Sequence, residues 1–290
     1  MKIKKAVIPA AGLGTRVLPA SKSMPKEMLP IVDKPAIQYI VEEAVHSGIE
    51  DILIITSRGK TTVEDHFDRN PELEARLLAS KKQEVYDEMV AISQMANIQY
   101  VRQKETKGLG HAVLCAKAFV GNEPFAVLYG DDVILSETPC TKQLCDAYEK
   151  YGKGVVGVKE VPGMAITKYC SLKTEPLEGN CYTCTDMIEK PKPEEIMGNF
   201  SILGRVVLPP QIFDILENTP LGTGNELQLT DAMKTLAQSE GVVAVDYEGV
   251  RYDMGNKFGI LQANIEVGLK HPETRDELKA YLKSIADKLD

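Results

Sequence analysis

Positive charge is in the minority in this chain. Its 290 residues contain 34 lysines and arginines against 42 aspartates and glutamates, which gives a formal net charge of -8 and a pI near 5.3. Proteins that bind nucleic acid or acidic membranes over a broad surface use clustered, excess lysine and arginine. The charge balance therefore argues against nucleic acid and membrane partners, while it leaves room for basic residues at one site.

Long apolar runs are also missing. No stretch approaches the roughly 18 apolar residues that a membrane-spanning helix needs. The basic residues 2–5 imitate the start of a signal peptide, but Pro9 and Gly12 break the apolar run behind them and Arg16 ends it. We therefore expect a cytoplasmic protein.

Cysteine is too sparse to form a disulfide framework, since there are six in the whole chain, and we expect reduced thiols. Cys181 and Cys184 have the spacing of half a zinc site. Their segment, however, has the pattern of a strand, where an odd spacing sends two side chains to opposite faces. The sequence therefore predicts no zinc site there.

Two familiar nucleotide-binding motifs are absent. A dinucleotide fingerprint would place a third glycine at position 17, where Val17 stands, and no Gly-Lys-Ser/Thr follows to make a Walker loop. These absences disfavour an NAD-dependent enzyme and a P-loop protein.

What is present instead is a glycine-rich loop after a short β-branched run at residues 6–8. Gly12 and Gly14 let backbone N–H groups approach an anion without obstruction from a Cβ atom. The two glycines alone are equally consistent with an ordinary turn between strand and helix. Arg16 and Lys26 add fixed positive charge, and together with the glycines they favour a site for nucleotide phosphates.

Short apolar runs alternate with amphipathic stretches in the first half of the chain, which predicts an α/β fold with parallel βαβ units. We expect strands at 6–8, 51–56, 98–101 and 124–130, helices at 35–48 and 110–120, and a helical insertion at 59–95 with helices at 61–67, 71–79 and 84–95.

The second half has shorter, more antiparallel patterns. We expect strands at 154–161, 169–173, 181–189, 200–208 and 242–247, and helices at 209–218, 226–239, 257–270 and 272–289. The two halves together predict a Rossmann-like, doubly wound mixed sheet with a helical insertion and C-terminal helices.

Polar side chains follow several of these strands. Gln103 comes after the third strand, Asp131 and Asp132 follow the fourth, and Asp253 precedes Gly255. Ligands of open α/β sheets bind at the carboxyl ends of the strands, and carboxylate oxygens suit Mg2+. The sequence therefore predicts a magnesium site at this edge.

Several motifs, in order along residues 4–270, resemble the sugar-1-phosphate nucleotidylyltransferases, in particular the bacterial UTP:glucose-1-phosphate uridylyltransferase family. The motifs are Ala-Ala-Gly-Leu-Gly-Thr-Arg at 10–16, Pro-Lys-Glu-Met-Leu-Pro at 25–30, Lys-Pro-Ala-Ile-Gln-Tyr at 34–39, Val-Glu-Asp-His-Phe-Asp at 63–68, Gly-Leu-Gly-His-Ala-Val at 108–113 and Glu-Leu-Gln-Leu-Thr-Asp at 226–231.

The resemblance implies Mg2+-dependent transfer of UMP from UTP to glucose 1-phosphate, giving UDP-glucose for galactose metabolism and envelope polysaccharides, by a homodimer or homotetramer. It implies one α/β domain over 1–256, with a nucleotide half at about 1–135 and a sugar half at about 136–256, and oligomerising helices at 257–290.

The resemblance also assigns roles to individual residues. Catalytic charge would come from Arg16, Lys26 and Lys190. The nucleotide would lie against Ala10, Ala11, Gly12, Gly14, Thr15, Gln103 and Gly108. The sugar would contact Cys170, Glu189, Lys190 and Gly204, and Mg2+ would bind Asp131 and Asp253. Taken alone, Glu189 and Lys190 are more typical of a surface ion pair than of a sugar site.

One residue departs from the family pattern. The family usually has glycine, with its backbone beside the glucose hydroxyls, where this chain has Cys170. The sugar preference is therefore open. Two alternative functions also stay open: the same chemistry with another nucleotide such as dTTP, and a non-catalytic regulator that binds UDP-sugars. A regulator would be expected to lose Arg16, Lys26 or the metal-binding aspartates, and all are present.

Overall fold

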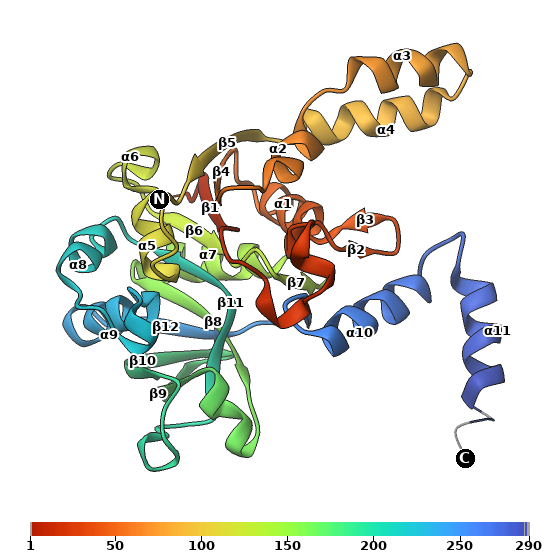
Figure 1. The fold of residues 1–290 in the computed structure, drawn as a ribbon. Helices are drawn as coiled ribbons and strands as arrows, with labels where there is room; N and C mark the ends of the chain where they lie inside the picture. Colours follow the sequence, from red (N-terminus) through yellow and green to blue (C-terminus); the bar gives the residue numbers. More distant parts are fainter. Residues whose placement is uncertain (1, 287, 289–290) are drawn as a thin grey trace.

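The molecule is built on one large mixed sheet with helices on both faces (Figure 1). The computed structural model describes residues 2–286 and 288, and within these the sheet has nine strands in the order β5-β4-β1-β6-β11-β8-β12-β10-β9. The strands are β1 (Lys5–Pro9), β4 (Asp51–Thr56), β5 (Asn97–Arg102), β6 (Phe125–Leu128), β8 (Gly154–Glu160), β9 (Cys170–Glu178), β10 (Cys181–Glu189), β11 (Phe200–Leu208) and β12 (Val242–Asp246). The predicted α/β class with a mixed sheet is confirmed.

Parallel pairing gathers the carboxyl ends of four strands at one edge. Strand β1 pairs in parallel with β4 and β6, and β4 pairs in parallel with β5. Strand β11 then joins the two halves by pairing antiparallel with both β6 and β8. The loops after Pro9, Thr56, Arg102 and Leu128 therefore emerge side by side, which is where ligands of such sheets bind.

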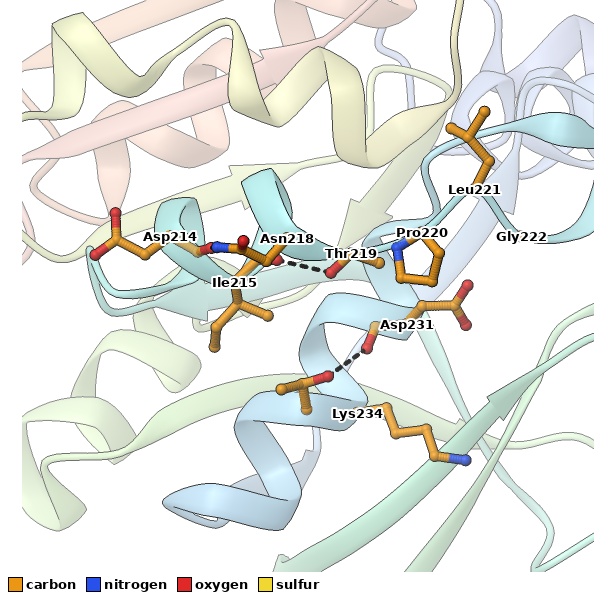
Figure 2. Close-up of a pocket in the computed structure, with 10 residues that line it drawn as sticks. Asp214, Ile215, Asn218, Thr219, Pro220, Leu221, Gly222, Asp231 and Lys234 are labelled. Carbon is orange, nitrogen blue, oxygen red and sulfur yellow. Dashed lines mark hydrogen bonds between the residues drawn. The ribbon is translucent and has the colours of Figure 1, made fainter.

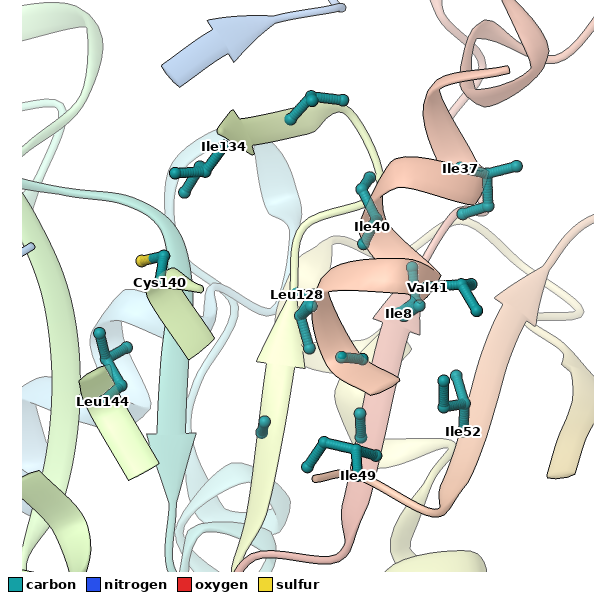
Figure 3. Close-up of a cluster of buried hydrophobic side chains, with 14 of the residues drawn as sticks. Ile8, Ile37, Ile40, Val41, Ile49, Ile52, Leu128, Ile134, Cys140 and Leu144 are labelled. Atoms are coloured by element: carbon teal, nitrogen blue, oxygen red, sulfur yellow. The ribbon is translucent and has the colours of Figure 1, made fainter. Parts of the chain in front are cut away.

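Each face of the sheet has its own hydrophobic core, and successive side chains along β1 point into the two cores in turn. Ala6 and Ile8 pack into one core, and Val7 packs into the other. Figure 3 shows the first core, in which Ile40 and Val41 of α1 (Ala36–His46) lie over the sheet. The other core packs under α5 (Leu109–Leu114), α8 (Ile212–Asn218) and α9 (Leu229–Ser239).

Two peripheral groups of helices leave this body. The predicted insertion is confirmed as α2 (Thr61–Phe67), α3 (Pro71–Ala79) and α4 (Gln83–Ser93), and Figure 1 shows α3 and α4 as a hairpin that projects from the sheet. At the other end, α10 (Lys257–Gly268) leads away from the sheet to α11 (Arg275–Ala286). Part of the helix predicted up to residue 289 lies outside the described residues.

One helix and four strands were not predicted. Helix α7 (Cys140–Tyr151) contains cysteine and threonine, which form helices weakly, yet Cys140, Leu144 and Cys145 are buried in the first core. Strands β7 (Asp132–Leu135) and β13 (Val250–Asp253) form a two-stranded antiparallel sheet, although more than a hundred residues separate them in the sequence. Strands β2 (Pro30–Ile31) and β3 (Lys34–Pro35) form a small hairpin. Local patterns carry no signal for such pairings.

Several predicted helices have different bounds: α8 and α11, for example, each begin three residues later than predicted, at Ile212 and Arg275. Residues 110–120 form two short helices, α5 and α6 (Lys117–Val120), instead of one. Helix α9 begins at Leu229 and not at 226, because the backbone of Leu227 pairs with Lys107 and Gly110. Residues 226–228 are therefore part of a packed loop.

A buried ion pair joins the two halves of the sheet to α1. Arg205 in β11 is 1% exposed, and its Nη2 lies 2.6 Å from Oε2 of Glu43 in α1. The same guanidinium donates to the carbonyls of Gly204 and Asp132 at 2.9 Å each. The hydroxyl of Thr141 in α7 donates to Glu43 at 2.6 Å. Both charges are thus surrounded by hydrogen-bond partners.

Arg205→Met should lower the free energy of unfolding by about 3–5 kcal/mol, because it leaves the Glu43 carboxylate buried and uncompensated. Urea unfolding followed by circular dichroism measures the change. The exposed pair of Lys142 and Asp146 is the control, since Lys142→Met should cost less than about 1 kcal/mol. Equal, small losses in both variants would contradict this view of Arg205.

Candidate active site

The glycine-rich loop follows β1 as predicted and is held in a defined turn. Gly14 has a φ of 68°, a left-handed conformation that favours glycine, and the hydroxyl of Ser21 donates to its carbonyl at 2.6 Å. Thr15–Val17 then form a short 3-10 turn, and Lys26 begins another at Lys26–Met28. Lys26 thereby returns to the loop, with its Nζ near the position that a Cβ of Gly12 would occupy.

A cavity of about 390 Å³ opens over this loop, and we call it the loop cavity. It brings together eight of the residues predicted to bind nucleotide, phosphate or metal, namely Ala11, Gly12, Gly14, Thr15, Lys26, Gln103, Gly108 and Asp131. Ala10 does not line the cavity, and its carbonyl instead accepts a hydrogen bond from Lys60. The lining also includes residues that were not predicted, among them Glu27, Thr106, Tyr129 and Glu226.

Gln103 and Gly108 form one wall of the loop cavity. The amide nitrogen of Gln103 lies 3.1 Å from the carbonyl of Gly108 and 2.9 Å from Nδ1 of His111. Gly108 has a φ of 96°, and a Cβ there would lie 2.7 Å from both Glu226 and the carbonyl of Leu227. The turn therefore requires glycine, and it fixes the side chain of Gln103 at the cavity wall.

A second cavity of about 740 Å³ lies beside the first, and we call it the hairpin cavity because the β9–β10 hairpin forms part of its wall. Six predicted residues line it: Arg16, Asp131, Cys170, Glu189, Lys190 and Asp253. Leu109, Tyr129 and Asp131 line both cavities. The two cavities are therefore adjacent, and Asp131 lies where they meet.

Opposite charges meet at this junction. Nζ of Lys26 lies 2.5 Å from Oδ2 of Asp131, and the guanidinium of Arg16 lies 3.6 Å from Asp131 and 3.5 Å from Asp253. Glycine at position 255 leaves room for this placement of the guanidinium, since a Cβ there would lie 2.5 Å from Nη2 of Arg16. Arg16 is thus held between two carboxylates, with its own side chain largely exposed.

The Lys26–Asp131 pair is charged at neutral pH. Burial alone would lower the pKa of Lys26, but the Asp131 and Glu27 carboxylates together outweigh burial and the pKa lies above its ordinary value. Burial alone would raise the pKa of Asp131, but Lys26 together with Arg16 and Arg251 outweighs burial and the pKa lies below its ordinary value. The next residue differs: burial raises the pKa of Asp132 to about 6, although Arg251 opposes the shift.

In the hairpin cavity, Glu189 and Lys190 lie at the end of β10. The hydroxyl of Thr230 donates to Oε2 of Glu189 at 2.8 Å, so the carboxylate has a partner in α9. The backbone N–H of Lys190 donates to the carbonyl of Tyr169 at 2.7 Å, which closes the hairpin end. Both side chains therefore face the cavity from a fixed backbone.

Cys170, at the start of β9, is buried and neutral. Its backbone N–H donates to the hydroxyl of Ser201 at 3.2 Å, and its Sγ accepts from the N–H of Ile202 at 3.2 Å. Burial raises the pKa of the thiol to about 11. The backbone N–H of Cys170 is therefore hydrogen-bonded within the protein.

Gly204 lies next to the hairpin cavity, and its predicted role stays a prediction. It was predicted as a sugar contact, but it is not among the described residues that line the two cavities. It has a φ of 88° and lies at the irregular register between Ile202 and Val206, where a Cβ would lie 2.9 Å from that of Asp132. The structure thus uses Gly204 for backbone geometry and for close packing against β7.

Three charged residues at the site were missed by the sequence analysis. Lys60 follows β4 and pairs with Glu27, and Arg251 lies 2.5 Å from Asp132 and 4.0 Å from Asp253. Lys60 follows a parallel strand, as Gln103 does, and Arg251 is two residues before Asp253 on one strand face. Both signals were present in the sequence, whereas nothing local marks Glu27 as buried.

The two carboxylates form a small donor set for a cation. Among the described residues, no three His, Cys, Asp or Glu side chains cluster at metal-binding distances. Mg2+ in nucleotide sites is usually held by one or two carboxylates together with substrate phosphates and water. Asp131 and Asp253, on either side of Arg16, fit that mode of binding.

A third hollow lies away from this charged junction. It holds about 560 Å³ between α8 and α9, and Figure 2 shows Asp214, Pro220, Asp231 and Lys234 around it. Its described lining contains none of the predicted site residues.

The helices of the described part of the chain include none that is long and apolar enough to span a membrane.

Comparison with known proteins places the chain in a family. The nucleotidyl transferase family matches residues 5–268. The chain is 55% identical over 284 residues to UTP--glucose-1-phosphate uridylyltransferase YngB of Bacillus subtilis, covering 98% of this chain and 96% of that protein. It is 53% identical over 284 residues to UTP--glucose-1-phosphate uridylyltransferase of Staphylococcus epidermidis, covering 98% and 99%.

Solved structures agree with this placement. The UTP-bound UGPase from Acinetobacter baumannii matches with a TM-score of 0.89 at 41% identity, covering 97% of this chain and 98% of that one. A UDP-glucose pyrophosphorylase complexed with UDP-glucose matches with a TM-score of 0.85 at 42% identity, covering 93% and 100%. The chain therefore belongs to the nucleotidyl transferase family and, within it, groups with the UTP--glucose-1-phosphate uridylyltransferases.

Proposed function

We propose that this protein transfers UMP from UTP to glucose 1-phosphate, with UDP-glucose and pyrophosphate as products. One observation carries the proposal: two adjacent cavities share Asp131, and the cations Lys26 and Arg16 lie where they meet. Such an arrangement suits two anionic substrates that react end to end. The similar proteins named above act on UTP and glucose 1-phosphate, which favours these two substrates over other pairs.

The reaction needs charge stabilisation more than it needs an activated nucleophile. The phosphate oxygen of the sugar phosphate attacks the α-phosphorus of UTP, the bond to the β-phosphate breaks, and pyrophosphate leaves with the electron pair. The barrier comes from bringing two anions together and from the charge on the leaving group. Arg16 and Lys26 would neutralise the departing phosphates from the loop side.

The other residues divide between base and sugar. Gln103 and the Gly108 turn form a rigid wall that would hydrogen-bond the edge of uracil. Lys190 would bind the phosphate of the sugar phosphate, and Glu189, already oriented by Thr230, would accept hydrogen bonds from sugar hydroxyls. Positioning of this kind converts a bimolecular encounter into a reaction within one complex.

Asp131 and Asp253 would hold Mg2+ together with substrate phosphates. The cation, when bound, would supply Lewis-acid stabilisation of phosphoryl oxygens. The two carboxylates now pair with Lys26 and Arg16, so metal and substrate would take over these contacts as the lysine and arginine turn to phosphate. We further propose that the reaction takes place in the cytoplasm.

Pyrophosphate release from UTP and glucose 1-phosphate, measured with and without Mg2+, tests the proposed function. We expect metal-dependent turnover, with both substrates required. The same assay with dTTP and with other sugar 1-phosphates ranks the alternative substrates. Calorimetric binding of UDP-glucose with no turnover under any condition would instead identify a non-catalytic regulator and overturn the proposal.

Asp131→Asn should reduce Mg2+-dependent turnover by at least about 100-fold, because it removes a charge at the proposed metal position. Steady-state kinetics over a range of Mg2+ concentrations measures the loss, and thermal unfolding checks the fold. Asp214→Asn, an exposed aspartate on α8, is the matched control and should be unaffected. A turnover near that of the wild type would rule out Asp131 as a metal ligand.

We also propose that α10 and α11 mediate assembly with a second copy of the chain. Phe258, Leu261, Ile265 and Leu269 recur at helical spacing from the start of α10 and are between 37% and 66% exposed. Helix α11 has no buried residue in its described part, and Tyr281 on it is 61% exposed. An apolar face that every copy carries can pair with itself about a two-fold axis.

Light scattering after gel filtration should give a mass of two or four times 31.9 kDa for the wild type and a smaller mass for Leu261→Asp. Leu261→Asp would bury an unpaired carboxylate in the apolar interface when two copies associate, and this would weaken their association. Leu177→Asp, at an exposed leucine in β9, is the control and should assemble normally. A monomeric wild type at micromolar concentration would contradict assembly through this face.

A further inference from the structure

A buried ion pair supports the glycine-rich loop from behind. Nζ of Lys60 lies 2.8 Å from Oε2 of Glu27, and the two side chains are 8% and 1% exposed. The same ammonium donates to the carbonyl of Ala10 at 2.5 Å. Lys60 therefore ties together three segments: the turn after β4, the start of the loop after β1, and the 3-10 turn that carries Lys26.

Stability alone does not account for this pair. A buried ion pair contributes little or nothing compared with apolar side chains of similar volume, because both charges lose their hydration. Its position is more informative, since Glu27 lines the loop cavity and Ala10 immediately precedes residues that line it. A contact of this kind can instead fix the direction of neighbouring polar groups.

The contact from Lys60 fixes the orientation of the peptide unit that joins Ala10 and Ala11. The carbonyl of Ala10 and the N–H of Ala11 belong to one planar trans unit, so they point in opposite directions. Lys60 holds the carbonyl toward the protein interior, and the N–H of Ala10 is held by the carbonyl of Ile55 at 2.8 Å. The N–H of Ala11 is thereby turned away from Lys60 on a residue that lines the loop cavity.

We propose that Lys60 is a positioning residue for the nucleotide. It aims the Ala11 N–H and, through Glu27, the adjacent Lys26 before the triphosphate binds, and it keeps the Ala10 carbonyl oxygen away from the phosphates. Preorganised donors of this kind need no rearrangement when the anion arrives. The inference rests on the proposed function of the loop cavity as the nucleotide site.

The test compares KM values for the two substrates in Lys60→Met. We expect KM for UTP to rise about 10- to 100-fold, the size of a lost hydrogen bond to a charged group, while KM for glucose 1-phosphate changes less than about twofold. Lys34→Met is the matched control, because Lys34 forms a half-buried pair with Glu42 at 2.8 Å outside both cavities. It should leave both KM values unchanged.

The double variant Lys60→Met/Glu27→Gln separates positioning from charge compensation. It removes the uncompensated carboxylate and should recover thermal stability, yet it should keep the raised KM for UTP. Recovery of a wild-type KM in the double variant, or an equal rise in both KM values, would overturn the inference. A wild type without turnover would reject the proposed function itself, and calorimetric binding of UTP by the same variants would then still test Lys60.

Discussion

The balance of charge around Asp131 is the interaction on which the site depends. Its carboxylate lies against Lys26 and near Arg16, and Arg16 in turn lies near Asp253. Without substrate, each of these two cations thus lies near a carboxylate. Anionic substrates and a divalent cation can replace these contacts one for one, so the resting arrangement already has the charges that the proposed reaction requires.

The fold explains why distant residues meet there. Parallel pairing of β1, β4, β5 and β6 brings four loops to one edge, and the β7–β13 sheet adds Asp132 and Asp253 from distant parts of the chain. The backbone N–H of Met254 donates to the carbonyl of Asp131 at 2.8 Å and fixes the two aspartate segments together. Glycine at 255 then leaves space for the guanidinium of Arg16.

Much of this edge could be predicted from the sequence, because strand ends and glycine turns have local signals. The loop after β1, Gln103 and Asp131 were found in this way. Lys60 and Arg251 obey the same rules but were missed, since each is ordinary as a single surface charge. Glu27 could not have been found, because its burial depends on Lys60, which is distant in the chain.

Other differences arise from contacts that no local pattern encodes. Helix α7 is stabilised by cysteines and Leu144 packed in a core, against weak helix propensity. Gly204 was predicted only as a site residue, and the structure adds a packing role through its positive φ and the nearby Asp132. The family resemblance supplied the roles of the sugar-side residues, and the structure adds that Cys170 turns its N–H toward Ser201.

The central claim is that the sugar phosphate attacks UTP directly and that no protein side chain becomes covalently attached. The Cys170 thiol fits this claim, because its pKa is raised to about 11 and it stays protonated. The most direct measurement is the stereochemical course at the α-phosphorus, followed by phosphorus NMR with one diastereomer of UTP that carries sulfur on that phosphate. The account predicts inversion of configuration. Retention would show two successive displacements through a covalent intermediate and would contradict it.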